Sequence, residues 1–194
     1  WWSNLDPEWK EVFKSTLGSD TTRVSLHRLV EQEKLHLRDA RVNDLSVLGE
    51  FLRLRELHFS GTGITTIPEL EALRSLKSLH ATSSPLQRIG AIALLKDLED
   101  LDISNTPIAD LRGLENLEAL RSLNCSGTQI KKLDALRPLV DLQVLDCSNT
   151  RVSKLDPVVY LSLRSLKAYN TKITSREVDK FKGENPDCNV VYYR

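Results

Sequence analysis

Leucine recurs along this chain at a nearly constant interval. The repeated position, called the register leucine below, is occupied by Leu35, Leu57, Leu79, Leu101, Leu123, Leu145 and Leu166, and then by Cys188. The interval is 22 residues throughout, except for one step of 21 that ends at Leu166. A fixed period of roughly 20 to 50 residues indicates a repeat array, in which each unit packs against its neighbours. We therefore expect one elongated domain.

Each unit has two halves with different hydrophobic periods. The first half alternates apolar and polar residues, as from Leu101 to Ile103, which is typical of a strand with one buried face. The second half spaces its apolar residues by three, as in the series Leu111, Leu114, Leu117 and Leu120. A helix of three residues per turn keeps that spacing on one stripe, whereas an α-helix distributes it around its axis. The pattern predicts stacked parallel strands joined by short 3₁₀ or extended segments.

The repeated pattern LxxLxLxxTxIxxLxxLxx resembles the leucine-rich repeat, specifically the short 22-residue bacterial type of internalin-like proteins. The resemblance covers residues 33–173 as seven repeats. It implies an α/β solenoid, a right-handed superhelix with a parallel sheet on its concave face and 3₁₀ or extended segments on its convex side. One position that is usually Asn in the family is here Ala40, Thr62, Ser84, Thr106, Thr128, Thr150 and Thr171. We expect the hydroxyls of the threonines and of Ser84 to bond the backbone in place of the asparagine ladder.

The ends of such an array need caps, because the terminal repeats would otherwise expose their core. We expect a helical N-terminal cap over residues 1–32, beginning near Pro7, and we interpret the three tryptophans of the first nine residues as a plug over the open end. The C-terminal cap spans 174–194. It should contain a helix after Ser175 that stops at Gly183, followed by a strand in which Cys188, Val190 and Tyr192 alternate.

Composition narrows the function. The 27 basic and 27 acidic residues cancel, which weakens any case for nucleic acid or an anionic membrane as partner. The sequence has no apolar run of the roughly 20 residues that would insert into a bilayer. Three cysteines do not form a disulfide framework, and we expect Cys125 and Cys147 to be small buried thiols. The thiols and the lack of a visible leader favour the cytoplasm slightly, while the resemblance implies a secreted or cell-surface protein; both stay open.

Three of the four histidines form a column on the predicted sheet. His36, His58 and His80 each follow a register leucine, so they should point outward from the concave face on neighbouring strands, with Asp102 next in line. These four residues are weak candidates for a transition-metal site or for a proton-sensitive switch. A column runs as a line on an open sheet, whereas metal ligands converge on a point. We therefore predict no metal and no cofactor.

Serine and threonine residues form a second column beside the histidines, so nucleophile, imidazole and carboxylate occur close together. Catalysis also requires an oriented base and oxyanion donors in a pocket that excludes water. An open sheet offers no such pocket, and no Gly-x-Ser-x-Gly turn is present. We predict that the protein is not an enzyme and has no catalytic residues.

The prediction for function is a protein-interaction module that recognises a protein partner through its concave face. The candidate binding residues are His36, Arg38, Glu56, His58, His80, Asp100, Asp102, Asn124, Asp146, Lys167 and Tyr169. Two alternatives remain: a metal- or pH-responsive module that uses the histidine column, and a structural spacer within a longer chain. The sequence does not indicate an oligomeric state.

Overall fold

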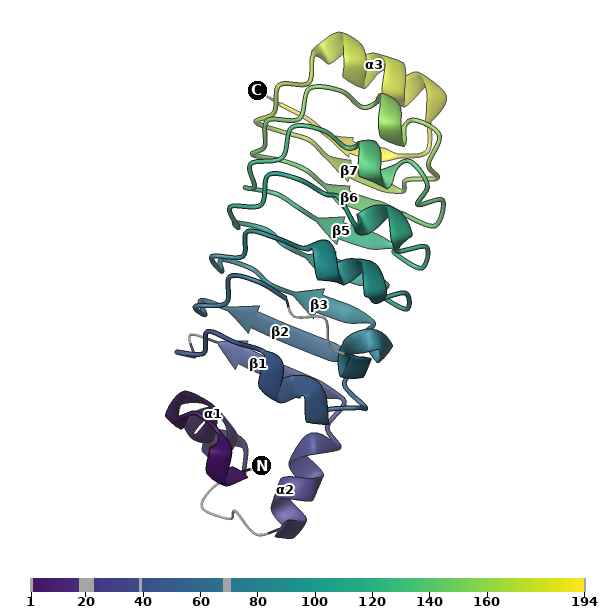
Figure 1. Cartoon of the computed structure of the whole chain (residues 1–194). Coiled ribbons are helices and arrows are strands. Elements are labelled where there is room, and N and C mark those ends of the chain that lie inside the picture. Colours follow the sequence, from purple (N-terminus) through teal and green to yellow (C-terminus); the bar gives the residue numbers. More distant parts are fainter. Residues whose placement is uncertain (1, 18–22, 39, 68–70, 194) are drawn as a thin grey trace.

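The computed structural model describes residues 2–17, 23–38, 40–67 and 71–193. Within these residues, eight parallel strands form one sheet in the order of the sequence. The strands are β1 Lys34–Arg38, β2 Glu56–Ser60, β3 Ser78–His80, β4 Asp100–Asp102, β5 Ser122–Asn124, β6 Val144–Asp146, β7 Ser165–Lys167 and β8 Asn189–Val191. Figure 1 shows a nearly straight column, with the two ends of the chain at opposite ends of the stack.

Neighbouring strands pair with their register leucines side by side. Leu35 pairs with Leu57, and the same pairing continues from strand to strand as far as Leu166. The predicted register is therefore confirmed from β1 to β7. It is strongly specified because a slip of one residue would turn the buried leucines of a strand toward solvent.

Short 3₁₀ helices and extended turns form the wall that faces the sheet across the core (Figure 1). They are η2 Ser46–Glu50, η3 Glu71–Ser75, η4 Gly90–Leu94, η5 Leu114–Asn116, η6 Asp134–Leu136 and η7 Asp156–Val158. The three-residue leucine spacing arises, as predicted, from turns of three residues. The N–H of Leu117 donates to the carbonyl of Leu114 at 2.9 Å, and both side chains are buried.

The hydroxyl ladder is also confirmed. Thr106, Thr128 and Thr150 are buried, and each hydroxyl donates to the backbone carbonyl three residues earlier at 2.6–2.7 Å. Ser84 and Thr171 do the same at 2.8 Å. These bonds close the turn that follows each strand. Thr62 is the exception among the described members, because its buried hydroxyl oxygen has no hydrogen-bond partner.

Helices close the N-terminal end of the stack. The cap consists of η1 Trp2–Asn4, α1 Pro7–Leu17 and α2 Arg23–Val30. The tryptophan plug is confirmed for Trp9, which is buried, lies 5.1 Å from the Phe13 ring and donates its indole N–H to the carbonyl of Asp44 at 3.0 Å. Trp2 is partly buried against the core, and Trp1 lies outside the described residues.

Two expectations about the C-terminal end are wrong. Helix α3, Ser175–Glu184, continues through Gly183, and Val190 rather than Cys188 pairs with Leu166. An α-helix rises about 1.5 Å per residue against about 2.0 Å for a 3₁₀ helix, so α3 needs extra residues to cross the same width. Cys188 therefore precedes β8 and is only partly buried against the core.

Candidate binding face

One face of the sheet packs on the core, and the other, called the open face from here on, points away from it. Because side chains alternate along a strand, each strand places two side chains on the open face, two residues apart. Over the stacked strands these side chains form two columns. The first column is Lys34, Glu56, Ser78, Asp100, Ser122, Val144 and Ser165, and the second is His36, His58, His80, Asp102, Asn124, Asp146 and Lys167. Strand pairing therefore brings the predicted neighbours side by side, including all three histidines.

The histidines form a stack of nearly parallel rings. The ring centroids of His36 and His58 are 4.3 Å apart with an interplanar angle of 4°, and those of His58 and His80 are 4.1 Å apart with an angle of 8°. The central ring, His58, has an imidazole on each side. Burial, and then the charges of the two neighbouring imidazoles, lower the pKa of His58.

Glu56 connects the start of the two columns. One carboxylate oxygen, Oε2, lies 2.6 Å from Nζ of Lys34, while the other, Oε1, lies 2.9 Å from Nε2 of His36 and 3.4 Å from Nε2 of His58. The hydrogen bonds with Lys34 and then His36 lower the pKa of Glu56 to about 2. Glu56 is therefore ionised at neutral pH and accepts hydrogen bonds from two side chains of the neighbouring strand β1.

The third histidine faces a different carboxylate. Nε2 of His80 lies 2.5 Å from Oδ2 of Asp100. This hydrogen bond raises the pKa of His80 and lowers that of Asp100. Asp102, which the sequence placed next to the histidines, is instead held by Asn124, whose Nδ2 donates to its Oδ2 at 2.9 Å. The predicted candidate metal set of three histidines and Asp102 is thus not brought together.

Asp102, Asn124 and Asp146 of the second column accept hydrogen bonds from the turns that follow their own strands. The backbone N–H two residues on donates to the side-chain oxygen of Asp102 at 2.8 Å, of Asn124 at 3.1 Å and of Asp146 at 3.0 Å. Asp146 also lies 3.7 Å from Nζ of Lys167 on the next strand. Such local side-chain bonds stabilise turns, so these three residues have a structural role in addition to any contact with a partner.

A pair of tyrosines ends the open face near the C-terminus. The rings of Tyr169 and Tyr193 stack with centroids 4.8 Å apart and an interplanar angle of 4°. Tyr169 is half-buried and Tyr193 is exposed. At the opposite end, Arg38 is exposed at the close of β1. The open face therefore has a histidine stack at one end, acidic and amide groups in its middle, and an aromatic pair at the other end.

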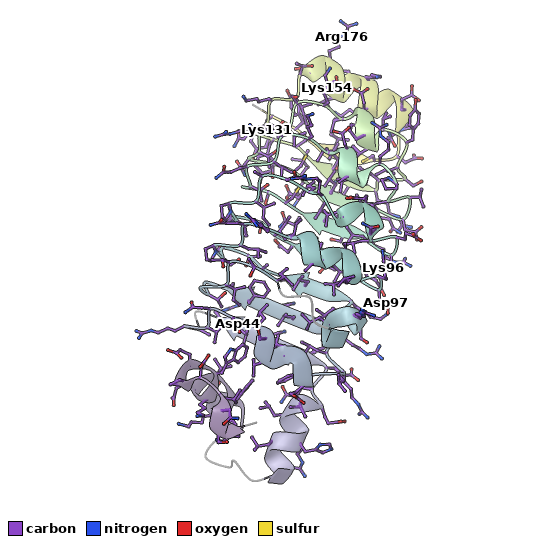
Figure 2. The ribbon with its side chains drawn as sticks, in the orientation of Figure 1. Asp44, Lys96, Asp97, Lys131, Lys154 and Arg176 are labelled. Carbon is purple, nitrogen blue, oxygen red and sulfur yellow. The ribbon has the colours of Figure 1, made fainter. Side chains whose placement is uncertain are left out.

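The turns and the outer wall carry charged side chains of their own. Figure 2 shows Lys96 and Asp97 at the edge of the stack between η4 and β4, and Lys131 at the opposite edge. Asp97 is exposed and makes no ion pair within the described residues. These positions provide controls for charge changes on the open face.

Comparison with known proteins decides the type of repeat. A family model described as leucine-rich repeats in two copies matches residues 96–138 and 118–160. The fold is a leucine-rich-repeat solenoid. No curated protein matches the chain in sequence.

Solved structures share this fold across the whole leucine-rich-repeat stack. Internalins inlF and inlC2 of Listeria monocytogenes superpose with a TM-score of 0.82 over 97% of this chain, at 22% and 24% identity. A leucine-rich-repeat protein of Leptospira interrogans superposes with a TM-score of 0.61 over 88% of this chain, at 18% identity. The chain spans 56%, 86% and 57% of the lengths of these three proteins, respectively. Leucine-rich-repeat proteins of the internalin type are generally non-catalytic protein-interaction modules.

The surface depression at the histidine stack is small. A shallow depression of about 210 Å³ is lined by His36, Leu37, Arg38, His58, Ser60, His80 and Thr82. Pockets for small molecules usually enclose roughly 300–1,000 Å³. Across the residues that the structure describes, no serine hydroxyl is hydrogen-bonded to a histidine.

Two residues of the open face, Lys34 and Tyr193, were not among the predicted binding residues, and the role of a third, Glu56, was not predicted. Lys34 orients Glu56, and opposite charges in neighbouring units of one column would have indicated that pair. Tyr193 joins Tyr169 because the last unit is longer than the register predicts, which no periodic pattern could indicate. Glu56 was named as a binding residue but not as the group shared by two histidines.

The buried thiols are confirmed. Cys125 and Cys147 are free and buried, and burial is the largest cause that raises the pKa of both, to about 12 for Cys147. Neither thiol is available as a thiolate near neutral pH.

No described helix is long and apolar enough to cross a membrane.

Proposed function

We propose that this chain is a protein-interaction module that holds its partner on the open face of its sheet. The observation that carries the proposal is the ordered display of side chains over neighbouring strands, fixed by the backbone pairing from β1 to β8. A rigid platform orders few groups on binding, so little of the interaction free energy is lost to conformational entropy.

Charge on the open face favours a partner with a basic feature opposite its centre. Asp100 is partly exposed, and Asp102 lies beside it on the same strand. Glu99 is partly exposed just before them, where Lys77 pairs with it at 2.7 Å. Such charges mainly tune the rate of association and the choice of partner.

The stacked tyrosines supply the anchor that the rest of the face lacks. Aromatic residues are enriched among the positions that dominate binding energy, because they bury a large area with few rotatable bonds. Tyr169 and Tyr193 already stack in the free chain, so their ring orientation is set before a partner arrives. We expect the partner to cover this end of the sheet and to extend toward Asp100.

The test is capture of a partner from a lysate of the source organism, identified by mass spectrometry. The variants are Asp100→Lys and Tyr169→Ala on the open face, and Asp97→Lys at the edge of the stack as the matched charge control. Asp102 is left unchanged, because its carboxylate holds the turn after β4.

The proposal predicts a protein that is retained by the wild type and by Asp97→Lys but is lost with Asp100→Lys and reduced with Tyr169→Ala. Retention by every variant would place binding on the caps or the outer wall and contradict the proposal. Absence of any retained protein would favour a structural spacer.

A further inference from the structure

We propose that His36, Glu56 and His58 form a binding site for a divalent transition-metal ion of the zinc class on the open face. The three donor atoms are Nε2 of His36, Oε1 of Glu56 and Nε2 of His58, and all lie within 4.8 Å of one another. They come from two adjacent strands, β1 and β2, whose pairing fixes the relative positions of their backbones.

The two distances from the carboxylate oxygen to the imidazole nitrogens are near those of a tetrahedral site, and the two nitrogens lie within 4.8 Å of each other. Zinc bonds to imidazole nitrogen and carboxylate oxygen are about 2.0–2.2 Å long, which separates neighbouring ligands of a tetrahedron by roughly 3.3–3.5 Å. Oε1 of Glu56 lies 3.4 Å from Nε2 of His58 and 2.9 Å from Nε2 of His36. Because an imidazole coordinates a metal in the plane of its ring, the stacked rings of His36 and His58 must also rotate out of their parallel arrangement, and Glu56 must move away from His36, for one ion to bind all three donors.

One donor is without a hydrogen bond. Nε2 of His58 is inaccessible to solvent and has no hydrogen-bond partner, although Oε1 of Glu56 lies 3.4 Å away. A buried polar atom left unpaired costs free energy, and a bound cation between Nε2 and the carboxylate would remove that cost.

The second oxygen of Glu56 is already fixed. Nζ of Lys34 lies 2.6 Å from Oε2, so Lys34 turns Oε1 toward the two imidazoles. Hydrogen bonds of this kind to a ligating carboxylate commonly hold it in position in metal sites. The positive charge of Lys34 opposes a cation, and its side chain is mostly exposed to solvent, which screens that repulsion.

The donor set selects the class of ion. Two imidazoles and one carboxylate suit zinc, copper or nickel, whereas calcium and magnesium prefer oxygen ligands throughout. His80 is not required, because its Nε2 is occupied by Asp100. Three protein ligands leave one tetrahedral position for water.

The test is calorimetric titration of the full chain with zinc chloride at about pH 7.5, where imidazoles are largely deprotonated. The wild type should bind one zinc ion per chain. His58→Ala and Glu56→Gln should each weaken zinc binding at least roughly tenfold, since each removes one of three ligands. Circular dichroism checks that each variant is folded, and Glu56→Gln keeps the side-chain shape if His58→Ala does not fold.

His27→Ala, in α2 and exposed, is the control and should bind zinc as the wild type does. His80→Ala should also bind zinc within roughly threefold of the wild type, because its nitrogen is not a ligand. Three results would overturn the proposal: no saturable zinc binding, binding unaffected by His58→Ala and Glu56→Gln, or a loss with His27→Ala or His80→Ala equal to that with His58→Ala.

Discussion

In the repeats from β2 to β7, the residue directly before the hydroxyl ladder position lies in the left-handed backbone region. In the described repeats that position is held by Gly61, Ser83, Asn105, Gly127, Asn149 and Asn170, with φ between 51° and 68°. Glycine adopts this conformation without strain and asparagine tolerates it better than most residues. The recurring Ser-Gly-Thr and Ser-Asn-Thr triplets are therefore a requirement of the turn and not a ligand-binding motif.

Ser83 is the member of this series least suited to its backbone, with a φ of 52°. Replacing it as Ser83→Asn should stabilise the protein by about 0.5–1 kcal/mol, because asparagine relieves part of the left-handed strain. Urea unfolding measures the change. Ser153→Asn, at an exposed position without a positive φ, is the control and should change stability by less than about 0.5 kcal/mol. A loss of stability with Ser83→Asn would refute this account of the turn.

The hydroxyl ladder offers a second test with an internal control. Thr128→Val should cost about 1–2 kcal/mol, because it leaves the carbonyl of Cys125 without the 2.6 Å bond from the hydroxyl. Thr62→Val should cost nothing or stabilise, because the buried hydroxyl of Thr62 has no partner to lose. Chemical unfolding of the two variants measures the difference. Equal losses would show that packing, and not the hydrogen bond, makes threonine necessary.

Elements differ in how far the sequence determines them. The strands and 3₁₀ segments follow from the leucine spacing, because each unit obeys the same alternation and buries the same positions. Helix α3 does not repeat that spacing, so the position of β8 and the partnership of Tyr169 with Tyr193 could not be predicted from it. On the open face the period predicts which side chains are neighbours, but side-chain rotation decides that Glu56 faces His58 and that Asp100 faces His80.

The N-terminal cap should act as a local plug. Phe13 is fully buried and stacks against Phe51 of the first repeat with ring centroids 5.7 Å apart. Phe13→Ala should cost about 3–5 kcal/mol, the usual result of removing a buried aromatic ring. Because a repeat contacts only its neighbours, hydrogen exchange should speed up in β1 and β2 well before β6 and β7.

The control for the plug is Leu52→Ala in the same repeat, since Leu52 is 70% exposed and should contribute less than about 0.5 kcal/mol. Uniform loss of protection from β1 to β7 in Phe13→Ala would mean that the stack unfolds as a single unit. That result would argue against a cap that protects mainly its nearest repeats.

At the scale of the whole molecule, proteins with few identical residues share this fold. Internalins inlF and inlC2 share the architecture with a TM-score of 0.82 at only 22% and 24% identity. A likeness at that level of identity establishes the architecture and carries no information on which side chains a partner contacts. The identity of a partner must therefore come from experiments on this chain, and its cellular compartment stays a prediction.

The proposed function requires a partner on the open face of the sheet. Two valines provide the most direct test: Val144 is 41% exposed in the first column, and Val140 is 70% exposed in the turn between η6 and β6. A photo-crosslinking residue placed at either position in the full chain, in a lysate of the source organism, reports what lies against it. We expect a discrete crosslinked protein from position 144 and none from position 140. A crosslink from position 140 alone, or from neither position, would contradict the proposed function.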